Sequence, residues 1–132
     1  MTVFADTAAL FALLDSGERY HAAAANAWRE FLELDAALVT TNYILLEAAA
    51  VIQRRIGLAA LRAFHDEIAP QLEVVWVDAD LHRSGVEATL IAARRDLSVV
   101  DCVSFRVMRN RGISIAFTLD SHFREQGFTV VP

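Results

Sequence analysis

The chain has 132 residues, of which 55% are apolar, with two prolines and five glycines. This composition predicts one ordered globular domain over residues 1–132 that can bury a sizeable core, and it excludes a low-complexity or disordered class. Seventeen acids against twelve arginines, with no lysine, give a formal charge of −5. An acidic chain is not an obvious nucleic-acid binder, since affinity for the phosphate backbone rests on cations. If four of its acids bind divalent metal, however, the remaining formal charge is close to zero. The net charge therefore does not exclude an RNA substrate.

Short apolar runs alternate with helical segments along the whole chain. The first run is Met1–Ala5, whose Val3-Phe4-Ala5 lacks polar alternation, as in a strand buried on both faces of a parallel sheet. The remaining strands are expected at Ala37–Thr41, Leu72–Val77, Ile113–Thr118 and Phe128–Val131. The helices are expected at Ala8–Leu14, Glu18–Leu34, Tyr43–Arg55, Leu58–Ile68, Asp78–Arg94, Ser98–Arg111 and Ser121–Gln126. Gly85 is expected to weaken the helix in which it lies. This alternation predicts an α/β fold with helices on both faces of a parallel sheet.

Compartment signals are few. The single cysteine, Cys102, excludes an internal disulfide and fits a reducing compartment, so we expect a cytoplasmic protein. The amino terminus has no basic region followed by an apolar stretch, so no signal peptide is expected. No uncharged apolar run reaches about 18 residues, so no membrane association is expected.

Four acids differ from those on solvated helix faces: Asp6, Glu47, Asp101 and Asp120. Asp6 and Asp120 end the first and fourth expected strands, whereas Glu47 and Asp101 lie among apolar residues of expected helices. Because burying an ionised carboxylate without a partner is very costly, each must be a helix cap, an ion-pair partner, a protonated acid or a metal ligand.

The simpler explanations stay open for each acid taken alone. Asp6 and Asp120 are plausible N-caps, and Ser98 to Asp101 matches a capping box. Glu47 lies about five residues into its helix, past the capping positions, so its alternative is a buried pair with an arginine.

Their common position favours a metal. In a parallel sheet Asp6 and Asp120 end at the edge where the helices of Glu47 and Asp101 begin, so all four carboxylates can converge. Four anions this close repel strongly and require a cation. Oxygen ligands without His or Cys favour Mg²⁺, with Mn²⁺ a plausible substitute. We interpret His122 as a surface residue, and Cys102, Trp28 and Trp76 as core.

Four stretches at this spacing resemble the PIN domain, specifically VapC-type toxins of type II toxin–antitoxin systems. They are Val3–Leu10, Thr40–Glu47, Asp96–Phe105 and Ala116–Phe123, with a closing Gly127–Pro132, so the resemblance covers essentially the whole chain. It implies a three-layer α/β/α fold with a parallel five-stranded sheet in the order 3-2-1-4-5.

The resemblance also implies an activity and a site. It implies an Mg²⁺-dependent endoribonuclease that cleaves RNA with a metal-activated water, a cognate VapB-type antitoxin that holds it inactive, and a homodimer. The family's acidic quartet carries over onto Asp6, Glu47, Asp101 and Asp120 as catalytic residues and metal ligands, and Thr7 takes the place of the hydroxyl that follows the first Asp. Arginines of the later helices are candidates for the RNA backbone, although ordinary solvated charge explains each as well: Arg83, Arg94, Arg95, Arg106 and Arg109.

Other functions are weighed against this one. A phospho-acceptor receiver needs paired acids after the first strand and a late lysine, and a haloacid-dehalogenase-type phosphatase needs a second Asp two residues after the first. The chain has neither pattern. A PIN nuclease without an antitoxin, acting in RNA processing or on DNA, and a catalytically idle PIN-like binding module remain alternatives.

Overall fold

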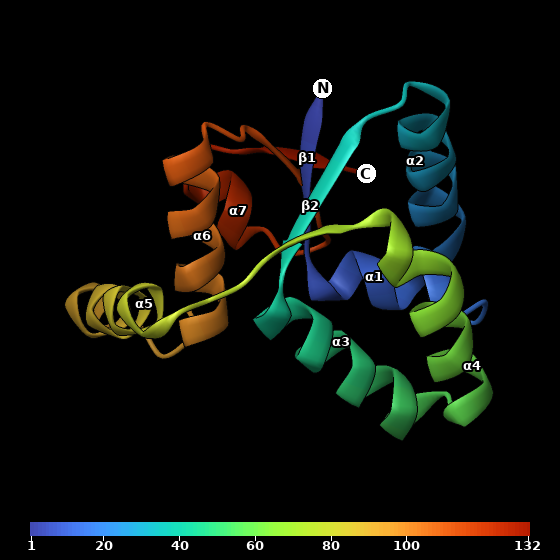
Figure 1. The fold of residues 1–132 in the computed structure, drawn as a ribbon, viewed down its shortest axis with the longest axis horizontal. Coiled ribbons are helices and arrows are strands. Elements are labelled where there is room, and N and C mark those ends of the chain that lie inside the picture. The colour runs from blue at the N-terminus through green and yellow to red at the C-terminus, as the bar shows by residue number, and fades with distance from the viewer.

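The computed structural model describes residues 1–132 and contains one five-stranded parallel sheet in the order β3-β2-β1-β4-β5 (Figure 1). The predicted sheet and its strand order are therefore confirmed. Each strand lies within its predicted range, and the strands are β1 (Thr2–Ala5), β2 (Ala37–Thr41), β3 (Glu73–Val75), β4 (Ile115–Phe117) and β5 (Thr129–Val131).

Seven α-helices connect and cover the strands. They are α1 (Thr7–Leu14), α2 (His21–Glu33), α3 (Asn42–Arg55), α4 (Leu58–Ala63), α5 (Ala79–Ala92), α6 (Val99–Arg111) and α7 (His122–Glu125). Figure 1 shows α1 to α4 gathered on one side of the strands and α5 to α7 on the other, which confirms the three layers. The helix predicted over Leu58–Ile68 continues past α4 as a π-helical turn, Phe64–Ile68. None of these helices has the length and apolar character that crossing a bilayer requires.

The central strand β1 fixes the position of the functional edge. Val3, Phe4 and Ala5 are 0% exposed, because β2 and β4 pair on the two edges of β1 while helices cover its faces. The next residue, Asp6, still pairs with the sheet, since its backbone N–H donates to the carbonyl of Phe117 at 3.0 Å. A carboxylate thus leaves the buried centre of the sheet at the carboxyl ends of the strands.

The prediction that both tryptophans belong to the core is correct only for Trp28, which is 7% exposed. Trp76 is 72% exposed. The physical reason is that β3 is an edge strand that ends at Val75, so the apolar run continues beyond the last pairing into an uncovered connection. An apolar run does not reveal by itself whether it lies at the centre or at the edge of a sheet.

Gly85 has a packing role in α5 that the sequence did not indicate. It is buried against α6, and a Cβ at this position would lie 2.3 Å from Cγ2 of Val103, which is itself 0% exposed. The glycine therefore permits the close approach of α5 and α6, which outweighs its poor helix propensity.

We expect Gly85→Ala to lower the free energy of unfolding by roughly 1–2 kcal/mol, because overpacking exceeds the gain in helix propensity. Val103 is β-branched and cannot rotate away inside a helix. Urea denaturation measures this change, and in the double variant Gly85→Ala/Val103→Ala the loss should be smaller than the sum of the two single losses. A Gly85→Ala protein more stable than wild type would contradict the close-packing argument.

Candidate metal centre

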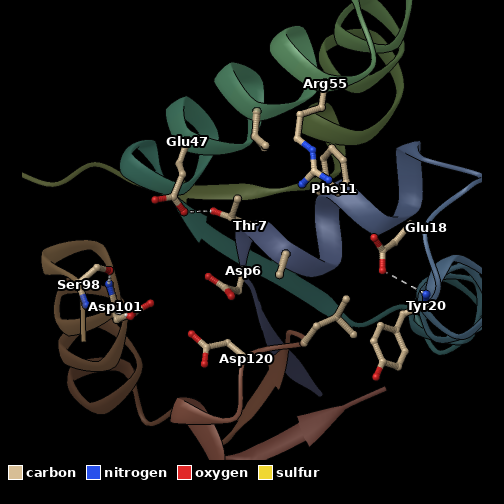
Figure 2. A pocket seen from close by; sticks show the side chains of 13 residues that line it. Asp6, Thr7, Phe11, Glu18, Tyr20, Glu47, Arg55, Ser98, Asp101 and Asp120 are labelled. Carbon is tan, nitrogen blue, oxygen red and sulfur yellow. Dashed lines mark hydrogen bonds between the residues drawn. The ribbon is translucent and has the colours of Figure 1, made fainter. Parts of the chain in front are cut away.

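A cavity of about 520 Å³ opens at the carboxyl edge of the sheet, where β1 and β4 end and α3 and α6 begin (Figure 2). The structure brings all five predicted site residues to its wall: Asp6, Thr7, Glu47, Asp101 and Asp120. They come from four separate parts of the chain, and Figure 2 shows the carboxylates of Asp6, Asp101 and Asp120 facing a common space. Convergence on one pocket is therefore observed.

Asp6 is the deepest of these acids, with 5% of its surface exposed. It occupies the N-cap position of α1, but its side chain makes no capping hydrogen bond, so the capping explanation fails for this carboxylate. Its Oδ2 instead accepts a hydrogen bond from Oγ1 of Thr118 at 2.7 Å. Burial raises the pKa of Asp6 to about 7, against the hydrogen bond from Thr118, and the charges of Asp101 and Asp120 add to the rise.

Asp101 combines a capping role with a place in the cavity. Its backbone N–H donates to Oγ of Ser98 at 2.9 Å, and its Oδ2 accepts the N–H of Ser98 at 3.1 Å, which is the capping box expected from the sequence. Oδ1 takes no part in this box. Partial burial raises the pKa of Asp101, and the negative charge of Asp120 adds to the rise. Capping and metal binding are therefore compatible, because they use different oxygens.

His122 was expected on the surface, and that expectation is wrong. Its side chain is only 20% exposed and lies between two acids, with Nε2 3.1 Å from Oδ2 of Asp96 and Nδ1 2.9 Å from Oδ1 of Asp120. The second contact is an electrostatic one, since its geometry is not that of a hydrogen bond and Oδ1 already accepts the backbone N–H of His122. Burial lowers the pKa of His122, but Asp96 and Asp120 outweigh that effect and raise it.

This histidine is also close enough to join a metal site. Single ligand atoms of Asp101, Asp120 and His122 all lie within 4.8 Å of one another. The sequence offered one signal for a role of His122 in the site, because it follows Asp120 by two residues at the start of a short helix. It gave no sign that the ring would fold back toward the carboxylate.

Glu47 lies on the rim of the cavity and is exposed, contrary to the expectation of a buried glutamate. No arginine pairs with it. Its Oε1 accepts a hydrogen bond from Oγ1 of Thr7 at 2.5 Å, which joins α3 to the first residue of α1 (Figure 2). Ile44 and Ala48 face the core at other angles of α3, whereas Leu46 is 72% exposed, so apolar neighbours in the sequence did not imply that Glu47 itself was buried.

None of the four acids has an arginine partner. The arginine ion pairs of the structure are Arg83–Asp80, Arg94–Asp96, Arg94–Glu125 and Arg111–Glu73. The carboxylates at the sheet edge therefore repel one another, and none of them is neutralised by a paired arginine. Carboxylate oxygens in a partly buried, anion-rich cavity are the donors that Mg²⁺ and Mn²⁺ prefer. The pKa of Asp6 is raised first by burial and then by the charges of Asp101 and Asp120, and a bound cation would oppose both effects. The residues present fit a divalent metal.

The arginine that lines this cavity was not among the candidates for RNA binding that the sequence suggested. Arg94 is held by Asp96 and Glu125, and Arg109 donates to Gln126. Arg55 of α3 lines the cavity instead. A signal for it was present, because Glu47, Val51 and Arg55 are spaced four residues apart on one helix face.

We expect the metal-free wild type to become less stable than the metal-free Asp6→Asn variant as the pH rises from 3.8 to about 7. The folded pKa of Asp6 is raised, so its contribution is fully present below the unfolded pKa and is lost as the pH rises through the folded pKa. The difference in free energy of unfolding should reach up to about 4 kcal/mol in favour of the asparagine variant, which still accepts from Thr118. Urea denaturation in EDTA across this range measures it. His122 is present in both proteins, so parallel pH profiles would contradict the raised pKa of Asp6.

Comparisons with known proteins agree with this geometry. A family model described as PIN domain matches residues 3–128. The chain is 32% identical over 130 residues to the 23S rRNA-specific endonuclease VapC20 of Mycobacterium tuberculosis, covering 98% of this chain and 97% of that protein. The crystal structure of VapC20, a sarcin–ricin loop cleaving toxin, matches with a TM-score of 0.87 over 98% of this chain and 99% of that one. The crystal structure of FitAcB from Neisseria gonorrhoeae shares the fold, with a TM-score of 0.69 over 98% of this chain and 96% of that one, at 11% identity. The chain therefore belongs to the PIN domain family.

Proposed function

We propose that this protein is a metal-dependent endoribonuclease and the toxin of a toxin–antitoxin pair. The observation that carries the proposal is the convergence of Asp6, Asp101 and Asp120 on one cavity, with Glu47 at its rim and no arginine to neutralise them. A domain that serves only for assembly does not require carboxylates this close together, because their mutual repulsion lowers the stability of the fold when no cation is bound.

The relatives support RNA as the substrate. VapC20 is a 23S rRNA-specific endonuclease, and its 32% identity extends over nearly the full length of both proteins. A structural match with a TM-score of 0.87 means that the sheet edge and the helices around it are arranged alike. We therefore propose an RNA phosphodiester as the bond that is cut, and a structured RNA loop as the class of target.

The residues that would hold the metal are Asp6, Asp101, Asp120 and Glu47. Bound Mg²⁺, or Mn²⁺ in its place, would lower the pKa of a water molecule and stabilise charge on the phosphate oxygens. Asp6 is fixed by Thr118, and Asp101 is fixed by its capping box with Ser98, so both carboxylates are held in place before metal arrives. Such fixed ligands lose little side-chain freedom on binding.

Glu47 takes a second role in this proposal besides holding the metal, and Thr7 supports it. Glu47 is exposed at the mouth of the cavity, so it can accept a proton from an attacking water and pass it to solvent. Thr7 fixes the direction of that carboxylate through its hydroxyl. His122 holds Asp120 from the other side, because it lies between Asp120 and Asp96.

The remaining parts of the proposal concern the setting. We propose that residues 1–132 act as one domain in the cytoplasm, that a cognate VapB-type antitoxin blocks the acidic cavity, and that the toxin is a homodimer. The identity to VapC20 supports the toxin assignment. A PIN nuclease that processes RNA without an antitoxin is the alternative within the family, and the presence of an antitoxin gene beside this one distinguishes the two.

Asp101→Asn should lower the rate of RNA cleavage by at least about a hundredfold, because it removes a charge from the metal site and keeps the shape of the side chain. A fluorescently labelled RNA stem–loop of the sarcin–ricin sequence is a suitable substrate, and circular dichroism checks the fold. Asp66→Asn is the matched control, since Asp66 is exposed and lies outside the cavity. EDTA should abolish cleavage by the wild type, and Mn²⁺ should restore it. A catalytically idle module would show neither cleavage nor Mn²⁺ binding in calorimetry.

Thr7→Val should reduce cleavage and Mn²⁺ affinity by about tenfold, whereas Thr7→Ser should stay close to wild type. Valine keeps the shape of threonine and removes the hydroxyl that donates to Glu47, and serine keeps that hydroxyl. Calorimetric Mn²⁺ titration and single-turnover cleavage measure the two quantities. Equal behaviour of valine and serine would show that the Thr7–Glu47 hydrogen bond does not orient the site.

A further inference from the structure

Arg55 is the only cation among the residues that line the cavity, which also include five acids. It lies at the carboxyl end of α3, above the ring of Phe11 of α1, and Figure 2 shows its guanidinium group beside that ring, on the wall of the cavity. An RNA-cutting site of this acidity needs cations to hold the strand once the metal is in place, because phosphate contacts supply most of the affinity. Arg55 is the one positively charged side chain in this wall that can make such a contact.

The guanidinium group of Arg55 is oriented but not neutralised. Its central carbon lies 5.0 Å from the centre of the Phe11 ring, within the range of a cation–π contact. It has no carboxylate partner and makes no side-chain hydrogen bond, whereas Arg83, Arg94 and Arg111 are all paired with acids. Its planar set of N–H donors is therefore available to a ligand, and a phosphate matches it in a two-point contact.

The helix geometry places Arg55 at a defined distance from the metal centre. Glu47, Val51 and Arg55 follow one another on a single face of α3, and eight residues of helix span on the order of 12 Å. Thr7 and Phe11 face them from α1, through the Thr7–Glu47 hydrogen bond at one end and the Phe11–Arg55 contact at the other. The seam between α1 and α3 thus leads from the proposed nucleophile-orienting residue to a free guanidinium group.

Helix stabilisation explains only part of this arrangement. Arg54 and Arg55 both lie in the last turn of α3, where a positive charge interacts favourably with the helix dipole. Arg54 has that position as well, yet it does not line the cavity. The orientation of Arg55 over Phe11 is therefore not required by its place at the end of the helix.

We infer that Arg55 binds a phosphate of the RNA strand that neighbours the cleaved phosphodiester, so that the strand runs along the seam between α1 and α3. This inference rests on the proposed ribonuclease function. In this arrangement the scissile phosphate lies at the acids with the metal, and Arg55, about two helical turns farther along α3 than Glu47, contacts the next phosphate of the strand. One contact at each end of the seam fixes the direction of the strand relative to the attacking water.

The test compares Arg55→Gln with Arg54→Gln, which remove the same charge from the same turn of α3. The probe is a fluorescently labelled sarcin–ricin stem–loop RNA, bound to the Asp101→Asn protein so that it is not cut. Arg55→Gln should raise the dissociation constant on the order of tenfold. It should also flatten the dependence of log affinity on log salt by about 0.7 to 0.9. Arg54→Gln should stay within about twofold, because an exposed charge outside the contact is screened. Arg55→Lys should fall between the two, since it keeps the charge and loses the planar fork.

Cleavage and metal binding give independent readouts. With Asp101 intact, Arg55→Gln should raise KM for this RNA more than it lowers kcat, and its Mn²⁺ affinity should equal that of the wild type. If Arg55→Gln and Arg54→Gln have equal effects while the wild type still cuts RNA, the role of Arg55 is overturned and the proposed ribonuclease function is not. A lowered Mn²⁺ affinity in Arg55→Gln would also overturn it, because Arg55 would then support the metal site. A wild type that neither binds nor cuts RNA would overturn the proposed function and this inference together.

Discussion

The burial of a carboxylate beside two others, at one edge of a parallel sheet, is the constraint on which the rest of this structure depends. Asp6 leaves the centre of the sheet almost completely buried, and burial together with the charges of Asp101 and Asp120 raises its pKa to about 7. Burial and neighbouring charge raise the pKa of Asp6 and of Asp101, so the ionised forms of these two acids lower the stability of the fold when no cation is bound. A divalent cation in the common space would make this arrangement favourable, so the features that lower stability without metal are the same features that suit the site to bind one.

The local structure prepares this site with ordinary helix and strand chemistry. Thr118 holds Asp6, and the capping box of α6 holds one oxygen of Asp101 while the other stays free. The capping explanation and the metal explanation of Asp101 were alternatives in the sequence, and the geometry shows that they operate together. The close approach of α5 to α6 at Gly85 supports the helix that carries Asp101, which links packing on the far side of α6 to the geometry of the cavity.

The parallel sheet and the convergence of the four acids were predictable because each depends on short patterns with few alternatives, whereas the strand order was implied only by the resemblance to the PIN domain. An acid that ends an apolar run must lie at a sheet edge, and a parallel sheet collects such ends on one side. The features that were missed depend on tertiary contacts. Trp76 is exposed because β3 is an edge strand, Glu47 is exposed because the cavity opens beside it, and His122 turns back between Asp96 and Asp120. Arg55 was not predicted because its place in the cavity wall depends on the packing of α3 against Phe11 of α1, although its spacing from Glu47 is visible in the sequence.

Depth in the cavity separates the tasks that otherwise similar side chains perform. Asp6 at the bottom is shielded from water, where an ionised carboxylate is most strongly stabilised by a bound cation and least useful for exchanging protons. Glu47 at the rim is in contact with solvent, where a carboxylate exchanges protons freely and interacts more weakly with a metal. Arg55 lies farther out along α3, where its charge does not compete with the metal for the acids. In the proposed function, a phosphodiester chain that enters the cavity would meet the metal ligands at its bottom, the proton acceptor at its rim and the guanidinium group of Arg55 along α3, so each group would act on a different part of the same strand.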